Sequence, residues 1–290
     1  MLEYNKHHQY YVDISYEITL KCNNRCSYCY NLAKLDNRTH VHEETFNHTI
    51  EQINKFVDEH PEYTVNVNLL GGEPLLVKEK VIELLERISN KVTVDIYANL
   101  NYKGSHLNGI EKYPNASVIC SWHESSDPDL IKENLLAYKG KIETSFFVSD
   151  ANFDTMYEHA MWAADNGIFY RIESIRGPKQ EYLFTGFETE KYKRMFTLGR
   201  SMRINQGINK PDDLDLGLSK DQLRYVSRYY HTICKINQYS ITYDGMVMAG
   251  CDYPYRSHIS KGLEIKEVYC PGYMCYCDTG AYKKLTKKTK

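Results

Sequence analysis

Long hydrophobic runs and an excess of one charge sign are both missing from this 290-residue chain. No segment approaches the roughly 18 consecutive apolar residues that a membrane-spanning helix needs, and Met1 to Asp13 contains no apolar core of a signal peptide. A cytoplasmic protein without membrane contacts is therefore expected. The 36 Lys and Arg residues against 38 Asp and Glu give a net charge of -2, so overall charge does not argue for nucleic-acid binding.

A fourth cysteine close to the first three is also missing. Cys22, Cys26 and Cys29 lie within eight residues, Cys120 stands alone, and five more cysteines fall between residues 234 and 277. Because reducing compartments keep thiols free, nine cysteines in such a chain indicate metal ligands or redox groups rather than disulfides. Cys120 has apolar neighbours in a predicted strand and is interpreted as a small core residue.

Short β-rich runs alternate with segments of helical period up to about Gly177, which predicts repeated βα units around a parallel sheet. Strands are expected at residues 14–20, 64–70, 92–98, 117–122, 142–148 and 169–175. Helices are expected at residues 43–60, 77–88, 129–138, 154–166 and 189–201, the first with an apolar stripe at helical spacing. Six consecutive units predict an α/β fold, an open (β/α)6 partial barrel.

The composition changes after residue 205. Residues 206–218 are rich in Gly, Asn, Pro and Asp, which is typical of a linker, and Asp244-Gly245 between two short β-rich runs predicts a β-hairpin. We expect an N-terminal extension at 1–13, the barrel at 14–205, a linker and helix at 206–230, a small cysteine-rich domain with the hairpin at 231–282, and a tail at 283–290. The tail holds five lysines and is expected to be disordered; nucleic-acid contact there is the alternative.

The first three cysteines form a Cys-x3-Cys-x2-Cys loop directly after a predicted strand. Three thiolates on one loop can bind three corners of a cube-shaped iron–sulfur cluster, which leaves the fourth iron open to a substrate or cofactor. The alternative is a zinc site that borrows a distant fourth ligand, although zinc usually takes paired cysteine or histidine ligands.

With Tyr28 before the third cysteine, this loop resembles the Cys-x3-Cys-x-aromatic-Cys signature of the radical S-adenosylmethionine (SAM) superfamily. The segment Gly71-Gly72-Glu73-Pro74, at the end of the second predicted strand, is similar to a Gly-Gly-Glu-Pro segment of that family. The resemblance covers about residues 12–180 and implies a radical SAM barrel. It implies these contacts: Cys22, Cys26 and Cys29 with a [4Fe–4S] cluster, and Tyr28, Gly71, Gly72, Glu73 and Pro74 with SAM, whose ammonium group would face Glu73.

The family chemistry implies that an electron from a donor such as flavodoxin or ferredoxin enters the cluster and cleaves SAM. The 5′-deoxyadenosyl radical so formed takes a hydrogen atom from the substrate. Polar residues at strand ends are the natural lining of such a site. Candidates are Asn99 and Ser121 for cofactor binding, and His123 and Glu173 for catalysis. A structural role for His123, and an ion pair between Glu173 and Arg176, are the alternatives.

Five cysteines near the C-terminus resemble the auxiliary-cluster extensions of radical SAM enzymes, called twitch with one cluster and SPASM with two. Five thiols are too few for two clusters, so we expect a twitch-like domain with one further [4Fe–4S] cluster. Its ligands would be Cys234, Cys251 and Cys270 with either Cys275 or Cys277. A structural zinc site is the alternative.

These motifs predict a radical SAM enzyme that removes a hydrogen from an amino-acid-like group and leaves it rearranged, cross-linked or oxidised. The group could belong to a small molecule, a peptide, a protein or a modified nucleobase. We expect no separate leader-peptide recognition domain in 290 residues, which weakens the interpretation as a ribosomal-peptide maturase. The alternative function is a non-catalytic binding module held together by zinc or iron–sulfur clusters.

Overall fold

The computed structural model of the chain describes residues 11–29, 31–33, 35, 39–175, 183–205, 233–235, 238–249, 255–264 and 267–269. Most of its strands form one nine-stranded sheet in the order β10-β9-β8-β1-β2-β3-β4-β5-β6. Strands β1 to β6 follow one another in chain order, and each neighbouring pair is parallel. The predicted open barrel of parallel strands is thus confirmed.

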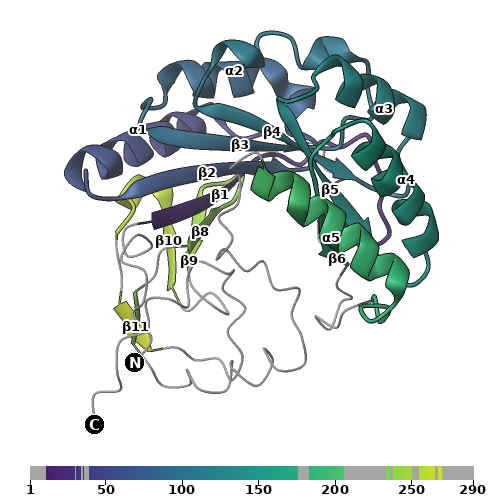
Figure 1. Ribbon diagram of the computed structural model, residues 1–290. Helices are drawn as coiled ribbons and strands as arrows, with labels where there is room; N and C mark the ends of the chain where they lie inside the picture. The colour runs from purple at the N-terminus through teal and green to yellow at the C-terminus, as the bar shows by residue number, and fades with distance from the viewer. Residues whose placement is uncertain are drawn as a thin grey trace.

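The helices lie on one side of this curved sheet, and Figure 1 shows α1 to α4 as an outer arc around the strands. The six barrel strands are β1 (Tyr11–Thr19), β2 (Thr64–Gly71), β3 (Val92–Ala98), β4 (Ala116–Trp122), β5 (Ile142–Val148) and β6 (Tyr170–Ser174). The helices are α1 (Glu43–Glu59), α2 (Lys78–Arg87), α3 (Pro128–Ala137), α4 (Phe153–Asp165) and α5 (Glu190–Asn205). Strand β1 begins three residues earlier than predicted, and α5 ends four residues later.

Alternation along the strands separates an apolar face from a polar one. On β3 the buried Val94 and Ile96 belong to the hydrophobic core, whereas Asp95 and Tyr97, which alternate with them, are only partly buried. The apolar face packs against the helices; Trp122 of β4, for example, stacks on a histidine of α4 with ring centroids 4.5 Å apart. The opposite, concave face is therefore the polar one.

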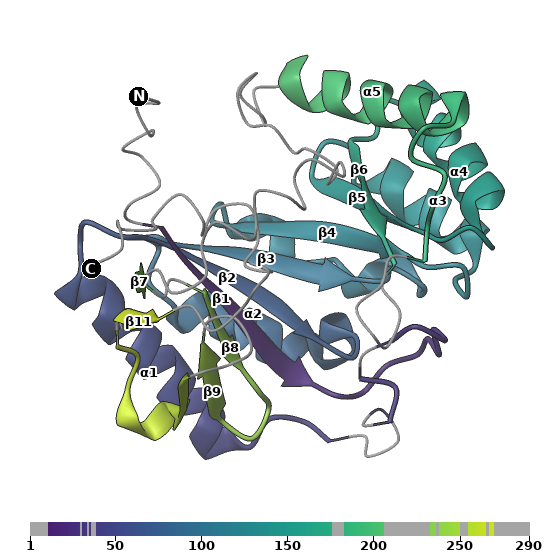
Figure 2. The ribbon, with the colours of Figure 1, turned by 90° about the horizontal axis from the view of Figure 1, so that it is seen from below.

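The sheet continues past β1 into the C-terminal part of the chain. Strand β8 (Gln238–Ile241) pairs in parallel with β1 and antiparallel with β9 (Met246–Ala249), which pairs with β10 (Tyr255–His258). Figure 2 shows β8 and β9 beside β1. The predicted hairpin is present, and Gly245 in its turn has φ +84°, which favours glycine. A separate two-stranded sheet pairs β7 (Ile233–Lys235) with β11 (Glu267–Tyr269).

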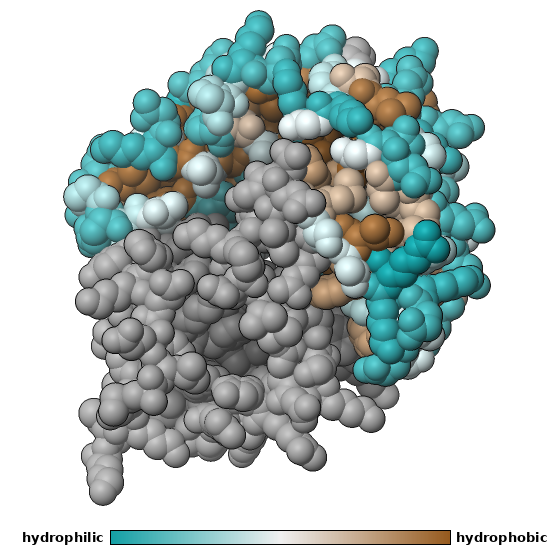
Figure 3. All heavy atoms as spheres, viewed as in Figure 1, coloured by the Kyte–Doolittle hydropathy of each residue, from teal (hydrophilic) through white to brown (hydrophobic). Residues whose placement is uncertain are grey.

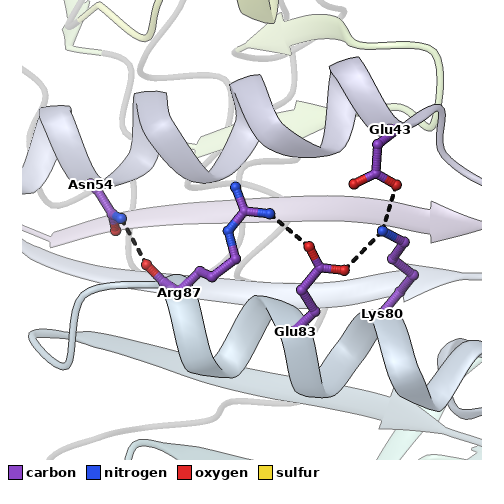
Figure 4. A network of polar contacts seen from close by, with 5 residues as sticks. All are labelled: Glu43, Asn54, Lys80, Glu83 and Arg87. Atoms are coloured by element: carbon purple, nitrogen blue, oxygen red, sulfur yellow. Dashed lines mark hydrogen bonds and ion pairs between the residues drawn. The ribbon is translucent and has the colours of Figure 1, made fainter.

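Helices α1 and α2 are joined on the surface by a polar network, shown in Figure 4. Lys80 contacts Glu43 at 2.6 Å and Glu83 at 2.8 Å, Arg87 contacts Glu83 at 2.7 Å, and Asn54 donates to the Arg87 carbonyl at 2.9 Å. Exposed ion pairs of this kind contribute about 0.2 to 1 kcal/mol each. Figure 3 shows this outer arc mostly covered by hydrophilic residues. Within the described ranges, no helix has the length and apolar character needed to cross a membrane.

Candidate functional site

A cavity of about 1160 Å³ lies at the carboxyl ends of the barrel strands. Its lining comes from the loop after β1 and from the ends of β2, β3, β4, β5 and β6. Ten of the residues selected from the sequence line it: Cys22, Cys26, Tyr28, Cys29, Gly71, Gly72, Glu73, Asn99, Ser121 and His123. In α/β barrels this end of the sheet is where active sites are found.

The three cysteines of the first loop line this cavity, and their thiols are removed from water in part. Burial raises the pKa of the Cys22 thiol to about 11, and burial likewise raises the pKa values of Cys26 and Cys29. Metal binding must therefore displace protons from these thiols. In the described part of the chain, no three His, Cys, Asp or Glu side chains converge on a single metal ion. Three thiols around one cavity fit a multi-iron cluster better than a single zinc ion.

Gly71 and Gly72 are required by the close packing of two chain segments. The backbone N–H of Gly72 donates to the Thr19 carbonyl at 2.7 Å, and that of Glu73 donates to the Lys21 carbonyl at 2.7 Å. A Cβ atom on Gly71 would lie 2.0 Å from the Thr19 oxygen, and one on Gly72 would lie 2.1 Å from the Lys21 oxygen. The glycines thus hold the end of β2 against the segment that leads directly into Cys22.

Glu73 is buried and organises the loops around it. Its carboxylate accepts hydrogen bonds from the backbone N–H of Asn99 at 2.6 Å and of Leu75 at 3.1 Å, and from the Tyr102 hydroxyl at 3.3 Å. Burial raises the pKa of Glu73 to about 7, against the effect of these hydrogen bonds. Pro74 is buried as well and begins a short 3₁₀ helix (Pro74–Val77), and it does not line the cavity. Glu73 thus belongs to the cavity wall, and Pro74 lies directly after it in sequence at the start of the 3₁₀ helix.

Four asparagines and a serine connect the cysteine loop to the loops after β3 and β4. Asn23 donates to the Asn101 carbonyl at 2.7 Å and accepts from the Asn99 amide at 2.7 Å. Asn101 donates to Asn24 at 2.8 Å, and Asn24 donates to the Ser126 hydroxyl at 2.8 Å. None of Asn23, Asn24, Asn101 and Ser126 is among the site residues predicted from the sequence. The signals that could have identified the asparagines are the place of Asn101 shortly after β3 and the place of Asn23 and Asn24 within the cysteine loop.

His123 forms part of the cavity wall together with Tyr28. The Tyr28 hydroxyl and His123 Nδ1 are 2.9 Å apart, and the imidazole stacks on Phe147 with ring centroids 5.0 Å apart. Burial lowers the pKa of His123 to about 4, so the ring is neutral at pH 7. A neutral, stacked and hydrogen-bonded histidine fits a positioning role for Tyr28 as well as the predicted catalytic role.

This neutral state predicts a pH dependence. Between pH 6.5 and 4 the unfolded chain protonates His123 while the folded chain does not, so stability falls as the pH decreases through this range. Asparagine does not titrate. Over this pH range we therefore expect the free energy of unfolding of His123→Asn to fall by about 2 to 3 kcal/mol less than that of the wild type. Urea unfolding of metal-free wild type and variant at pH 7 and pH 4 measures it. If wild type and variant differ in their free energy of unfolding by the same amount at pH 7 and at pH 4, the imidazole is not held neutral.

Glu173 does not line the cavity, in contrast to its predicted catalytic place. It lies on β6, and its carboxylate is 3.4 Å from Nε of Arg171. Arg171 also donates to the Ser145 hydroxyl at 2.7 Å and to the Tyr97 hydroxyl at 3.1 Å. The alternative partner expected from the sequence, Arg176, lies outside the described residues. Glu173 therefore belongs to a polar group on the concave face that Arg171 joins to the cavity residue Tyr97.

The predicted second cluster falls largely outside the described residues, which do not include Cys251, Cys270, Cys275 or Cys277. Cys234 lies in β7, opposite Val268 of β11. Strand β11 ends at Tyr269, directly before Cys270. Cys120 is fully buried in the hydrophobic core and does not line the cavity, consistent with its interpretation as a packing residue.

Comparison with known proteins gives two findings about this chain, while no curated protein matches it. In fold it is similar to native anSMEcpe with bound AdoMet (another abbreviation for SAM), with a TM-score of 0.57, 16% identity, and 86% of this chain and 78% of that chain covered. A hexahistidine-tagged form of anSMEcpe with bound AdoMet gives a TM-score of 0.58 with the same identity and coverage. Residues 16–114, which include the cysteine loop and Gly71 to Pro74, match the model of the Radical SAM superfamily.

Proposed function

We propose that the protein is a radical SAM enzyme that cleaves SAM reductively and removes a hydrogen atom from an amino-acid-like group of its substrate. The observation that carries this proposal is that Cys22, Cys26 and Cys29 share one cavity with Gly71 to Glu73. Two motifs from separate βα units thus meet where a cluster and SAM would have to be adjacent. The match of residues 16–114 to the Radical SAM superfamily supports the same function.

The residues of the cavity fit the proposed cofactors. Three thiols suit iron and leave one iron of a [4Fe–4S] cluster without a protein ligand. When bound, the cluster would supply one electron that splits SAM into methionine and a 5′-deoxyadenosyl radical. The chain's part is to orient the bound groups through the Gly71–Gly72 contact and the asparagine network, and to exclude water with Tyr28, His123 and Phe147.

A group with both charge signs on the concave face, joined to the cavity by the hydrogen bond from Arg171 to Tyr97, supports an amino-acid-like substrate. Arg171 is the only Lys, Arg or His within β1 to β6, and its side chain is 22% exposed. The acidic residues Asp95 on β3, Glu143 on β5 and Glu173 on β6 are all partly buried. A guanidinium binds carboxylates well, and carboxylates bind ammonium groups. The substrate would then be a free amino acid derivative, a peptide or protein residue, or a similarly substituted nucleobase.

We further propose that the C-terminal cysteines hold a second, auxiliary [4Fe–4S] cluster. The β7–β11 pairing supports this, because it brings the strand containing Cys234 beside the strand that directly precedes Cys270. Such a cluster could accept an electron from the substrate radical, which would give an oxidised product. A flavodoxin or ferredoxin is the proposed electron donor for the first cluster.

Anaerobic reconstitution with iron and sulfide tests the function. We expect brown protein with roughly eight irons per chain, four for each cluster. Dithionite and SAM should then release 5′-deoxyadenosine. As an arm of the same experiment, Cys251→Ala should bind roughly half the iron and still cleave SAM, but should not convert substrate. Deuterium transfer from labelled amino acids and peptides into 5′-deoxyadenosine would identify the substrate class.

The alternative function, a non-catalytic binding module, gives the opposite result. A colourless protein that takes up zinc and leaves SAM intact would refute the proposed enzymatic function. Full conversion of substrate by Cys251→Ala would remove the auxiliary cluster from the reaction while leaving the first cluster in place.

A further inference from the structure

Two of the three cysteine sulfurs in the cavity are contacted by side chains from other loops. Ser125 Oγ lies 3.4 Å from Cys26 Sγ, and Asn99 Nδ2 lies 3.9 Å from Cys22 Sγ. The backbone N–H of Asn24 also donates to Cys22 Sγ at 3.4 Å. Ser125 follows β4 and Asn99 follows β3. They lie about a hundred and about eighty positions after the cysteines that they contact, yet both reach the same loop.

The orientation of the Asn99 amide is fixed by its other partners. The backbone N–H of Asn101 donates to Asn99 Oδ1 at 2.9 Å, and an N–H can donate only to the oxygen of this amide. Nδ2 must therefore be the atom on the side of Cys22. It carries two hydrogens, one for Asn23 Oδ1 at 2.7 Å and the other available toward the sulfur.

The donor in the Ser125 contact is fixed once a metal is bound. A metal-bound cysteine is a thiolate, which has no proton to give, so the serine hydroxyl must donate to the sulfur. Cys26 is only 6% exposed, so little water competes with this donor. The turn that carries Ser125 is held by the hydrogen bond from the Ser126 N–H to the His123 carbonyl at 3.1 Å and by the Asn24 contact to Ser126.

We propose that Ser125 and Asn99 are positioning residues that set the reduction potential of the N-terminal cluster by donating hydrogen bonds to the sulfurs of Cys26 and Cys22. This rests on the proposed function, because it requires a cluster on these thiols. The reduced cluster carries one more negative charge than the oxidised one, and donors to its sulfurs stabilise that charge. Reduction adds one electron from dithionite or another low-potential donor; the serine and the amide keep their protons, and no bond breaks.

Ser125→Ala is the test for the serine. Ser125 is exposed in a turn, so its replacement should leave the fold and the iron content unchanged. A hydrogen bond to the sulfur stabilises the more negative, reduced cluster more than the oxidised one, so without it we expect the ratio of reduced to oxidised cluster at fixed potential to fall roughly tenfold. For a one-electron couple, a tenfold change corresponds to 59 mV. Ser125→Thr keeps the hydroxyl and should restore the wild-type ratio.

Redox titration followed by electron paramagnetic resonance measures this ratio in the holoenzyme. The signal that changes when SAM is added belongs to the cluster with the open iron, which separates it from an auxiliary cluster. An unshifted potential in Ser125→Ala, in a protein that still binds its cluster and cleaves SAM, overturns this inference and leaves the proposed function intact. Loss of the cluster from Ser125→Ala alone would also overturn it, since the serine would then serve assembly. A wild-type protein that binds no cluster would instead refute the proposed function.

Discussion

Cys26→Ala is expected to abolish the release of 5′-deoxyadenosine. Cys26 is buried at the cavity wall, and the variant would leave the proposed cluster with two protein ligands instead of three. Changes to residues that only support a metal ligand cost about 10- to 100-fold in affinity or activity, so loss of the ligand itself should cost more. We expect cleavage below the detection limit in an anaerobic assay with dithionite and SAM, and iron content reduced by roughly half if the auxiliary cluster is present.

Cys120→Ala is the matched control. It makes the same chemical change in the same barrel, but Cys120 is part of the hydrophobic core and does not line the cavity. We expect it to lower the free energy of unfolding by about 1 kcal/mol and to leave SAM cleavage unchanged. Wild-type cleavage by Cys26→Ala, or equal loss in both variants, would contradict the assignment of the first cluster to this loop.

The second large effect is expected at Gly71. Alanine here places Cβ 2.0 Å from the Thr19 carbonyl oxygen, at a φ of +129° that L-residues rarely adopt. The backbone must move apart, which weakens the hydrogen bonds from Gly72 and Glu73 to the segment before Cys22. We expect Gly71→Ala to lose about 4 kcal/mol of stability and most of its cluster binding. Urea unfolding and iron analysis after reconstitution measure the two effects.

Gly140→Ala separates steric contact from backbone strain. Gly140 also has a positive φ, +83°, but a Cβ there meets no atom within 4 Å. This control should cost only about 1 to 2 kcal/mol and should bind its clusters normally. If both variants lose the same stability, the contact between the end of β2 and the cysteine loop is not what requires glycine at Gly71.

The barrel could be predicted from the sequence because its strands and helices have strong periodicities. Strands β3 and β5 have the bounds predicted from the sequence, since apolar and polar residues alternate along Val92–Ala98 and an amphipathic helix follows Ile142–Val148. The C-terminal end of α5 is harder to predict from the sequence. The helix continues to Asn205, because no glycine or proline in its last turn marks an earlier end.

The candidate site could be predicted only where its residues form local motifs. The cysteine loop and Gly71 to Glu73 are contiguous in sequence, and the cavity brings them together. The contacts of Asn24 with Ser126 and of Cys26 with Ser125 join residues about a hundred positions apart, and no local pattern encodes them. The same limit applies to Glu73. Its type and place predict contact with a ligand, whereas two of its three hydrogen bonds come from Asn99 and Tyr102 in the loop after β3.

The parallel pairing of β8 with β1 has a consequence for how the chain matures. During synthesis, β1 to β6 are complete long before residues 238–241 exist, so one edge of β1 stays open while the barrel is already able to collapse. An unpaired strand edge is a template for association with other chains. It is also the edge of the strand that ends just before Cys22. Strand β8 therefore covers this edge of β1, and a barrel released before residues 238–241 would present an adhesive edge beside its cysteine loop.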